Sequence, residues 1–146
     1  MHQPYVGETF IGSPLGAQLQ RGGATQVLRA HQRSQLDQAF LCATDPSMFA
    51  TESLQRAFQR LTARVRAVRW GGDCYTPCMI AAGHADLVVE AGLKPWDIQP
   101  LIPVLQAAGA VVSDWSGGPA DYSDKVVIAA NPQLHQQALA ALNWAQ

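Results

Sequence analysis

Long apolar runs are missing from this sequence. No stretch approaches the roughly 18 consecutive apolar residues that a membrane-spanning helix needs. The segment from Met1 to Phe10 has neither the basic region nor the apolar region of a secretory signal. An excess of basic charge is missing too, because 10 Lys and Arg stand against 11 Asp and Glu, for a formal net charge of −1. We therefore expect a cytoplasmic protein with neither nucleic acid nor a membrane as a partner.

Cysteine is scarce, and its three residues cannot form a complete set of disulfides. An odd number of cysteines fits a reducing compartment. Cys74 and Cys78 are four residues apart and would share a helix face, but the sequence offers no second pair and no suitably spaced histidine for a tetrahedral metal site. We therefore interpret the cysteines as small buried apolar side chains.

The residues that are present are typical of a globular protein. Of the 146 residues, 48% are apolar and 14% are charged, so we expect a single domain with one core over residues 1–146. Apolar alternation and helical periodicity follow each other along the chain, which predicts an α/β layer structure. The predicted strands cover residues 5–11, 15–19, 36–43, 65–70, 86–90, 110–113 and 125–129, and the predicted helices cover 52–62, 74–82, 97–108 and 132–142.

Local signals mark the starts of several predicted helices. Thr51 and Asn131 are suitable N-caps, and Pro132 fits the first position of the helix that follows. A helix that begins at Asp97 is less regular, because Pro103 implies a kink or a later start.

Two carboxylates lie near each other in the predicted fold. Glu90 ends a buried strand, and seven residues later Asp97 opens a helix. Both would lie at the edge of the sheet where α/β proteins place their binding sites, and a carboxylate at a helix start can hold a divalent cation beside a phosphate. Asp97 can equally be an ordinary N-cap and Glu90 a loop charge. The spacing alone leaves both interpretations open.

Longer segments carry a more specific signal. Residues 96–119 read W-D-I-Q-P-L-I-P-V-L-Q-A-A-G-A-V-V-S-D-W-S-G-G-P, and residues 81–92 read A-A-G-H-A-D-L-V-V-E-A-G. They resemble two signatures of the inositol monophosphatase family, namely W-D-x-A-A with A-G-G-x-V-x-D-x-x-G-x-P, and A-x-G-x-x-D-x-x-x-E. Residues 1–12 and the I-A-A-N of 128–131 are similar to other strands of that family. The resemblance covers nearly the whole chain and is weakest over residues 26–64.

One part of the family pattern is absent. The signature D-P-[IL]-D-G-T and the glutamate before it occur nowhere in the sequence. In the family, those residues supply most of the metal ligands and the threonine that helps to activate water. The resemblance therefore implies a layered α-β-α sugar phosphatase fold of which this chain is the C-terminal portion, with Met1 an internal methionine and the N-terminal metal-binding half absent. We expect such a chain to be inactive in isolation, and an inactive remnant or interaction module is the alternative of another class.

A short motif indicates one branch of the family. Residues 71–75 read G-G-D-C-Y and residues 92–97 read G-L-K-P-W-D, which is similar to the histidinol-phosphate phosphatase branch rather than to the G-[ST]-A-A of inositol phosphatases. Asp73 would then face the substrate, where an added carboxylate suits a cationic amine better than a neutral polyol. A plain helix cap is the alternative for Asp73.

The resemblance implies a role for each matching residue. It implies Mg²⁺-dependent hydrolysis of a small-molecule phosphate monoester, with Asp97 as a metal ligand and no catalytic residue from this half. Asp73 and Glu90 would hold the organic part of the substrate, and Gly71 and Gly72 would let the backbone approach it closely. Histidinol phosphate, from histidine biosynthesis, is the favoured substrate, and inositol 1-phosphate or a related sugar phosphate is the alternative. We expect the full-length form to be a homodimer.

Overall fold

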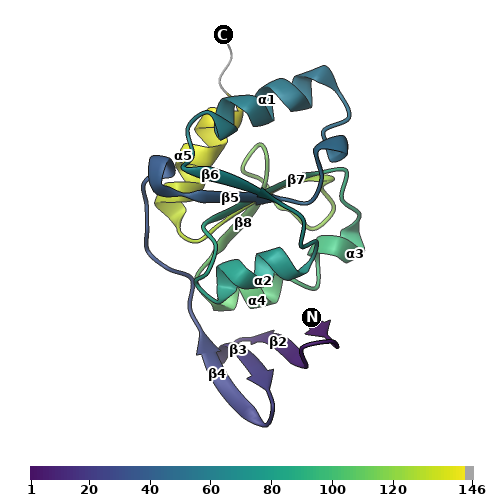
Figure 1. The fold of residues 1–146 in the computed structure, drawn as a ribbon, viewed down its shortest axis with the longest axis vertical. Coiled ribbons are helices and arrows are strands. Elements are labelled where there is room, and N and C mark those ends of the chain that lie inside the picture. The colour runs from purple at the N-terminus through teal and green to yellow at the C-terminus, as the bar shows by residue number, and fades with distance from the viewer. Residues whose placement is uncertain (144–146) are drawn as a thin grey trace.

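The computed structural model describes residues 1–143, which form two β-sheets and two layers of helices (Figure 1). The strands are β1 (His2–Gln3), β2 (Glu8–Ser13), β3 (Gly16–Arg21), β4 (Ala24–Leu28), β5 (Phe40–Ala43), β6 (Ala67–Trp70), β7 (Leu87–Ala91), β8 (Val111–Asp114) and β9 (Lys125–Ala129). The helices are α1 (Glu52–Thr62), α2 (Tyr75–Ala81), α3 (Pro95–Ile98), α4 (Ile102–Ala107) and α5 (Pro132–Leu142), with single 3₁₀ turns at Leu36–Gln38 and Pro46–Met48. The predicted α/β class is confirmed. None of these helices is long and apolar enough to cross a membrane, a finding that covers the described residues.

The layers follow one another along the long axis of the molecule. Strands β1 to β4 form an antiparallel sheet in sequence order at one end (Figure 1). Helices α2 and α4 lie between this small sheet and the second sheet, and α1 and α5 cover the other face of the second sheet. The strand order of the second sheet is β6-β5-β7-β9-β8. Strand β5 pairs in parallel with β6 and β7, whereas β9 is antiparallel to both β7 and β8.

The centre of the second sheet is β7, and all five of its residues are buried. A strand covered on both faces normally reads as a continuous apolar run, and β7 follows this rule except at Glu90. Asp86, directly before β7, is buried as well. A carboxylate therefore lies at each end of the central strand.

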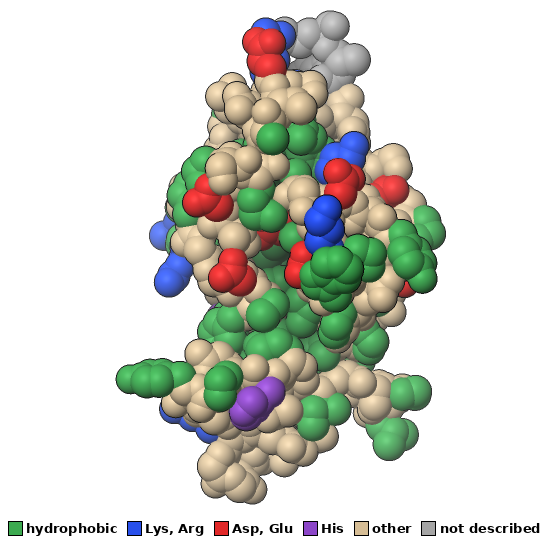
Figure 2. All heavy atoms as spheres, turned by 90° about the vertical axis from the view of Figure 1, so that its right-hand side faces the viewer, with side chains coloured by type: hydrophobic (Ala, Val, Ile, Leu, Met, Phe, Trp, Pro, Cys, Tyr) green, Lys and Arg blue, Asp and Glu red, His purple; other side chains and the backbone are tan. Residues whose placement is uncertain are grey.

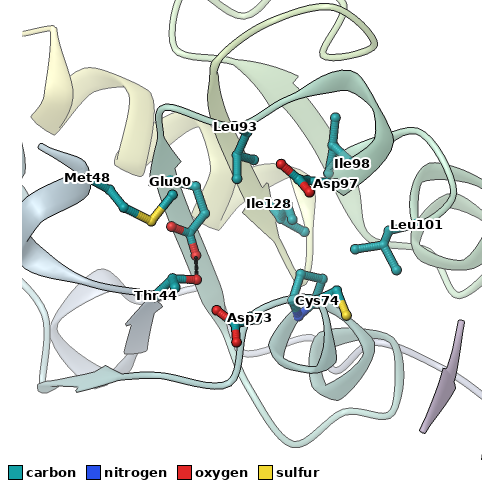
Figure 3. Close-up of a pocket in the computed structure, with 11 residues that line it drawn as sticks. Thr44, Met48, Asp73, Cys74, Glu90, Leu93, Asp97, Ile98, Leu101 and Ile128 are labelled. Carbon is teal, nitrogen blue, oxygen red and sulfur yellow. Dashed lines mark hydrogen bonds between the residues drawn. The ribbon is translucent and has the colours of Figure 1, made fainter.

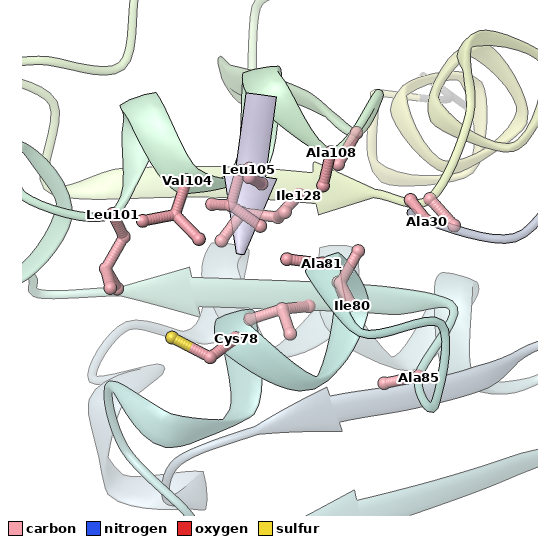
Figure 4. Packing of buried hydrophobic residues seen from close by; sticks show 14 of the residues in the cluster. Ala30, Cys78, Ile80, Ala81, Ala85, Leu101, Val104, Leu105, Ala108 and Ile128 are labelled. Carbon is pink, nitrogen blue, oxygen red and sulfur yellow. The ribbon is translucent and has the colours of Figure 1, made fainter. Parts of the chain in front are cut away.

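Two apolar cores lie on the two faces of the second sheet, so the expectation of one core is wrong. In one core, Ile80 of α2 and Leu105 of α4 pack near Ile128 of β9 (Figure 4). The other core lies under α1 and α5 and contains stacked aromatic rings, with the centroids of Phe49 and Phe58 4.1 Å apart. Burial of these side chains on both faces stabilises the sheet that carries the candidate site.

The small sheet touches the helix layer at a very close contact. Gly12 of β2 lies against the backbone of Pro103 and Val104 at the start of α4, and a methyl group at Gly12 would overlap both. Phe10 and Leu28 of the small sheet are almost fully buried and belong to the same apolar core as Val104. Glycine is needed here because the strand and helix backbones meet without room for a side chain.

Several predicted elements are confirmed together with their local signals. Helix α1 begins after Thr51, whose hydroxyl accepts a hydrogen bond from the Leu54 N–H. Helix α5 begins after Asn131, whose side chain accepts a hydrogen bond from the Leu134 N–H. The strand predicted at 125–129 is β9.

The prediction of one helix over residues 97–108 is wrong. The chain forms α3 and α4 with a break between them, because Pro100 and Pro103 each lack a backbone N–H for a continuous helix. Asp97 is therefore the third residue of α3 and not the start of a helix.

Two further predictions need correction, and one strand was missed. The strand predicted at 36–43 is shortened to β5, because Leu36–Gln38 form a 3₁₀ turn. Strand β4 was not expected at all. The interpretation of the cysteines as buried holds for Cys42 and Cys78 and is wrong for Cys74, which is exposed because it lies just before α2 and not on the buried face of that helix.

Candidate functional site

Three carboxylates meet in one pocket. Asp73 comes from the turn before α2, Glu90 from β7 and Asp97 from α3 (Figure 3). The pocket has a volume of about 290 Å³. Its lining, in chain order, is Thr44, Met48, Asp73, Cys74, Pro77, Glu90, Leu93, Asp97, Ile98, Leu101 and Ile128. In the space-filling view of the side of the molecule next to α3, acidic side chains gather around a hollow at mid-height (Figure 2).

Glu90 is deeply buried, with 5% of its surface exposed. Its Oε1 accepts a hydrogen bond of 2.8 Å from the Thr44 hydroxyl, whereas its Oε2 has no hydrogen-bond partner among residues 1–143. Burial raises the pKa of the Glu90 carboxyl above its ordinary value, the hydrogen bonds from Thr44 oppose the rise, and the negative charge of Asp73 adds to it. A buried carboxylate oxygen without a partner is energetically costly, which indicates a site for a cation or a hydrogen-bond donor.

Asp97 uses one oxygen to stabilise the start of α3. Its Oδ2 accepts a hydrogen bond of 2.8 Å from the backbone N–H of Lys94, the residue before the helix. Asp97 thus stabilises the helix start, but it is not the N-cap residue itself. It acts from the third helical position, as the acid of a capping box does. The side chain also lines the pocket, so its second oxygen is open to a ligand.

Asp73 has an unusual backbone conformation. Its φ of 41° is the only positive value at a non-glycine residue in the described part of the chain. This left-handed conformation is one that aspartate tolerates better than most side chains. The plain helix cap is not observed, because Cys74 precedes the first residue of α2 and no side chain caps that end. Asp73 instead lines the pocket (Figure 3).

Gly71 and Gly72 lie next to the pocket in sequence but do not line it. Both have positive φ angles, 94° and 99°, and a methyl group at Gly72 would overlap the Thr76 hydroxyl. They line an adjacent hollow of about 270 Å³ together with Arg69 and His84, among others. The structure therefore brings three of the five predicted site residues together and places the two glycines beside them.

Thr44 and Cys74 belong to the pocket but were not predicted as site residues. Thr44 is 46 residues before Glu90 in the chain and reaches it because β5 and β7 are neighbours in the sheet. A threonine in a turn gives no sequence signal for such a contact. Cys74 did have a signal, since it directly follows Asp73 in the G-G-D-C-Y motif.

The pocket is acidic, and none of the described residues that line it is basic. Such a lining attracts cations and repels a phosphate group unless positive charge is bound nearby. Carboxylate oxygens are ligands that Mg²⁺ prefers, so the donor chemistry fits this ion. Over residues 1–143, however, no three His, Cys, Asp or Glu side chains are placed to hold a metal ion together. A magnesium site here would need further ligands.

Fold and pocket together define a layered α/β protein with an acidic pocket at the edge of its central sheet. The family model that matches this sequence is that of the inositol monophosphatase family, over residues 1–146. The chain belongs to the inositol monophosphatase family.

Similar proteins include enzymes named for two different substrates. The chain is 35% identical over 151 residues to the bifunctional phosphatase IMPL2, chloroplastic, of Arabidopsis thaliana, a match that covers 97% of this chain and 42% of that protein. It is 31% identical over 122 residues to the histidinol-phosphatase of Mycobacterium tuberculosis, covering 84% of this chain and 46% of that protein. A solved inositol monophosphatase from Zymomonas mobilis aligns with a TM-score of 0.90 at 32% identity, covering 98% of this chain and 56% of that one.

The chain spans about half the length of the curated relatives it matches. What the complete relatives do therefore applies to this chain only as a proposal.

Proposed function

We propose that this chain carries the substrate-recognition part of a metal-dependent phosphatase whose substrate is a phosphate monoester with a cationic organic part. Histidinol phosphate is the proposed substrate, which would assign the protein to histidine biosynthesis. Residues 1–146 are taken as one domain that requires further chain to complete the metal site. A homodimer of the full-length form and a cytoplasmic location remain predictions, and the Arabidopsis relative is named chloroplastic.

The main support for the proposal is a pocket that contains both Glu90 and Asp73 and has no basic residue in its described lining. The buried charge of Glu90 and the carboxylate of Asp73 together attract an ammonium group of the substrate into the pocket. A charge-assisted hydrogen bond is stronger than one between neutral groups, so the pocket favours an amine over a hydroxyl. The similarity to a histidinol-phosphatase supports the same substrate class.

The acidic pocket also requires positive charge near the phosphate, and Asp97 is the residue of this chain that would hold it. Bound Mg²⁺ would neutralise phosphoryl oxygens and lower the pKa of a bound water. The Lys94 N–H fixes the orientation of the Asp97 carboxylate through Oδ2. One such carboxylate cannot hold Mg²⁺ strongly, so we expect the 146-residue chain to bind it no more tightly than about 1 mM and to show no turnover. Micromolar binding in titration calorimetry would contradict this expectation.

A neutral polyol phosphate such as inositol 1-phosphate is the second candidate substrate. The 0.90 TM-score and 32% identity to a solved inositol monophosphatase favour it. A chain that binds a partner and catalyses nothing is the alternative of another class. The two candidate substrates differ in how much the charge of Asp73 contributes to kcat/KM.

The test joins this chain to the portion of the Arabidopsis relative that it does not match and compares kcat/KM on the two substrates. Asp73→Asn is the informative change, because asparagine also tolerates the left-handed backbone and removes only the charge. We expect kcat/KM on histidinol phosphate to fall about ten- to a hundred-fold, as for loss of one charge-assisted hydrogen bond, with little change on inositol 1-phosphate.

Asp97→Asn is the control, and it should lower turnover of both substrates alike. Equal losses on the two substrates from Asp73→Asn would reject the cationic substrate. A folded joined protein without turnover of either substrate would favour the non-catalytic alternative.

A further inference from the structure

The pocket contains a thiol that the proposed function does not use. Cys74 is exposed and lines the pocket, whereas Cys42 and Cys78 are buried. Burial raises the pKa of the Cys78 thiol to about 12, and its Sγ lies 3.7 Å from the Cys74 carbonyl oxygen as a hydrogen-bond donor. Burial also raises the pKa of the Cys42 thiol. Because Cys74 is the exposed one of the three thiols, it is the cysteine that a dissolved reagent should reach and modify first.

A second observation says what kind of reagent the pocket favours. Glu90 is 95% buried, and its Oε2 is left without a partner by the described chain in the same pocket as Cys74. Asp73, the residue directly before Cys74, and Asp97 add their carboxylates, and no described residue of the lining is basic. A small molecule with a positive group is therefore concentrated beside the thiol.

We infer that Cys74 is a site of thiol–disulfide exchange selective for small disulfides that carry an ammonium group. The Cys74 thiolate attacks one sulfur of the disulfide, the disulfide bond breaks, and a new bond forms between Cys74 Sγ and that sulfur. The other sulfur leaves as a thiolate and takes up a proton in place of the one that Cys74 released, so no net oxidant is consumed.

The product has a consequence for the pocket. After exchange with cystamine, an aminoethylthio group remains on Cys74, with its ammonium two carbons from the sulfur and within a pocket of about 290 Å³. That group competes for the space in which the proposed function places the organic part of the substrate. The inference rests on the proposed function only for this competition, and the block is reversed by a reducing agent.

The experiment uses the 146-residue chain and two disulfides of nearly equal size. Cystamine carries ammonium groups, and 2-hydroxyethyl disulfide carries neutral hydroxyls. Modification is followed by intact-protein mass spectrometry at one pH and low ionic strength, and each rate is divided by the rate of the same disulfide with a neutral model thiol. We expect the normalised rate to be about ten-fold higher for cystamine, with the preference reduced at high salt. Peptide mapping should find the modification on Cys74, and Cys74→Ser should abolish it.

Charge-removing variants test whether the pocket causes the preference. Asp73→Asn and Glu90→Gln should each reduce it several-fold, whereas Glu52→Gln, on the exposed start of α1 outside the pocket, should leave it unchanged. Two separate variants keep the test valid if one of them folds poorly. Equal normalised rates for the two disulfides, a preference that survives both pocket variants, or modification at Cys42 or Cys78 would overturn the inference.

The outcome is independent of the substrate assignment, because exchange needs neither a metal nor turnover. Absence of the cystamine preference, together with a selective effect of Asp73→Asn on histidinol phosphate, would reject this inference alone. A clear cystamine preference, together with equal effects of Asp73→Asn on both substrates, would reject the proposed substrate alone.

Discussion

Asp86 and Glu90 lie at opposite ends of the same central strand, and both are nearly covered, with exposed fractions of 1% and 5%. Around Asp86 the chain supplies several positive or donating groups. Oδ2 accepts hydrogen bonds from the Phe40 N–H at 2.8 Å and the Arg33 guanidinium at 3.4 Å, and Oδ1, which accepts no hydrogen bond from the described residues, lies in contact with His31 Nε2. These groups surround the Asp86 charge with partners from the chain itself.

Around Glu90 the chain supplies fewer hydrogen-bond donors and no ion-pair partner among the described residues. The Thr44 hydroxyl bonds to one oxygen, and no described residue bonds to the other. Two equally buried carboxylates thus differ in what the rest of the protein provides for them. The Asp86 carboxylate has a cationic partner in Arg33, whereas the described chain provides no ion pair for Glu90, so Asp86 is the carboxylate with a structural role and Glu90 the one suited to a ligand site.

The largest change in the free energy of unfolding should come from removing the charge of Asp86. Asp86→Asn keeps the size of the side chain but leaves His31 and Arg33 without their carboxylate. The buried carboxylate is lost from its hydrogen bonds with the Phe40 N–H and the partly exposed Arg33, so we expect the free energy of unfolding to fall by about 2 kcal/mol. Urea denaturation of the variant and the parent chain measures this. Unchanged or increased stability of Asp86→Asn, as expected for Glu90→Gln, would remove the distinction between the two ends.

A smaller effect should follow from removing the one partner of Glu90. Thr44→Val deletes the hydroxyl that bonds to Oε1, and we expect a loss of about 1 kcal/mol together with a further rise in the pKa of Glu90. An NMR titration of the Glu90 carboxyl carbon measures the shift. The loss in stability should shrink in the Glu90→Gln background, where no carboxylate remains to be satisfied, and an unchanged loss there would show that Thr44 acts through packing.

The smallest effect should be a gain in stability from Glu90→Gln. Because burial raises the pKa of Glu90 above 4.5, the folded chain keeps a proton that the unfolded chain has already released. The protonated Glu90 carboxyl therefore contributes stability that is fully present below the pKa of this group in the unfolded chain. That contribution is lost as pH rises through the pKa of Glu90 in the folded chain. The variant should lack this decline and be more stable at neutral pH by about 0.5 kcal/mol. Urea denaturation across pH 4 to 8 tests the sign, and lower stability of the variant at neutral pH would contradict it.

The sequence predicts those features of the fold that have local causes. Thr51 and Asn131 cap their helices with their own side chains, so the signal and the structure lie within a few residues of each other. Glu90 and Asp97 could be predicted as neighbours because the end of a buried strand and the next helix must meet at one edge of the sheet.

Features that depend on distant residues could not be predicted. Strand β4 is largely exposed and is formed by its pairing with β3. No apolar pattern in the sequence predicts this pairing. The contacts of Asp86 with His31 and of Glu90 with Thr44 join segments that only the completed sheet brings together. That Oε2 of Glu90 has no hydrogen-bond partner among the described residues follows from those tertiary contacts, and no sequence motif predicts it.

The strand order of the second sheet has a consequence for the synthesis of this protein. The central strand β7 pairs with β5, which precedes it in the chain, and with β9, which is not made until residue 129. A nascent chain on the ribosome can therefore form the small sheet and the β6-β5-β7 part early, while one edge of the fully buried strand β7 stays open. Until β9 is released, that edge is a place where a chaperone or another nascent chain can pair.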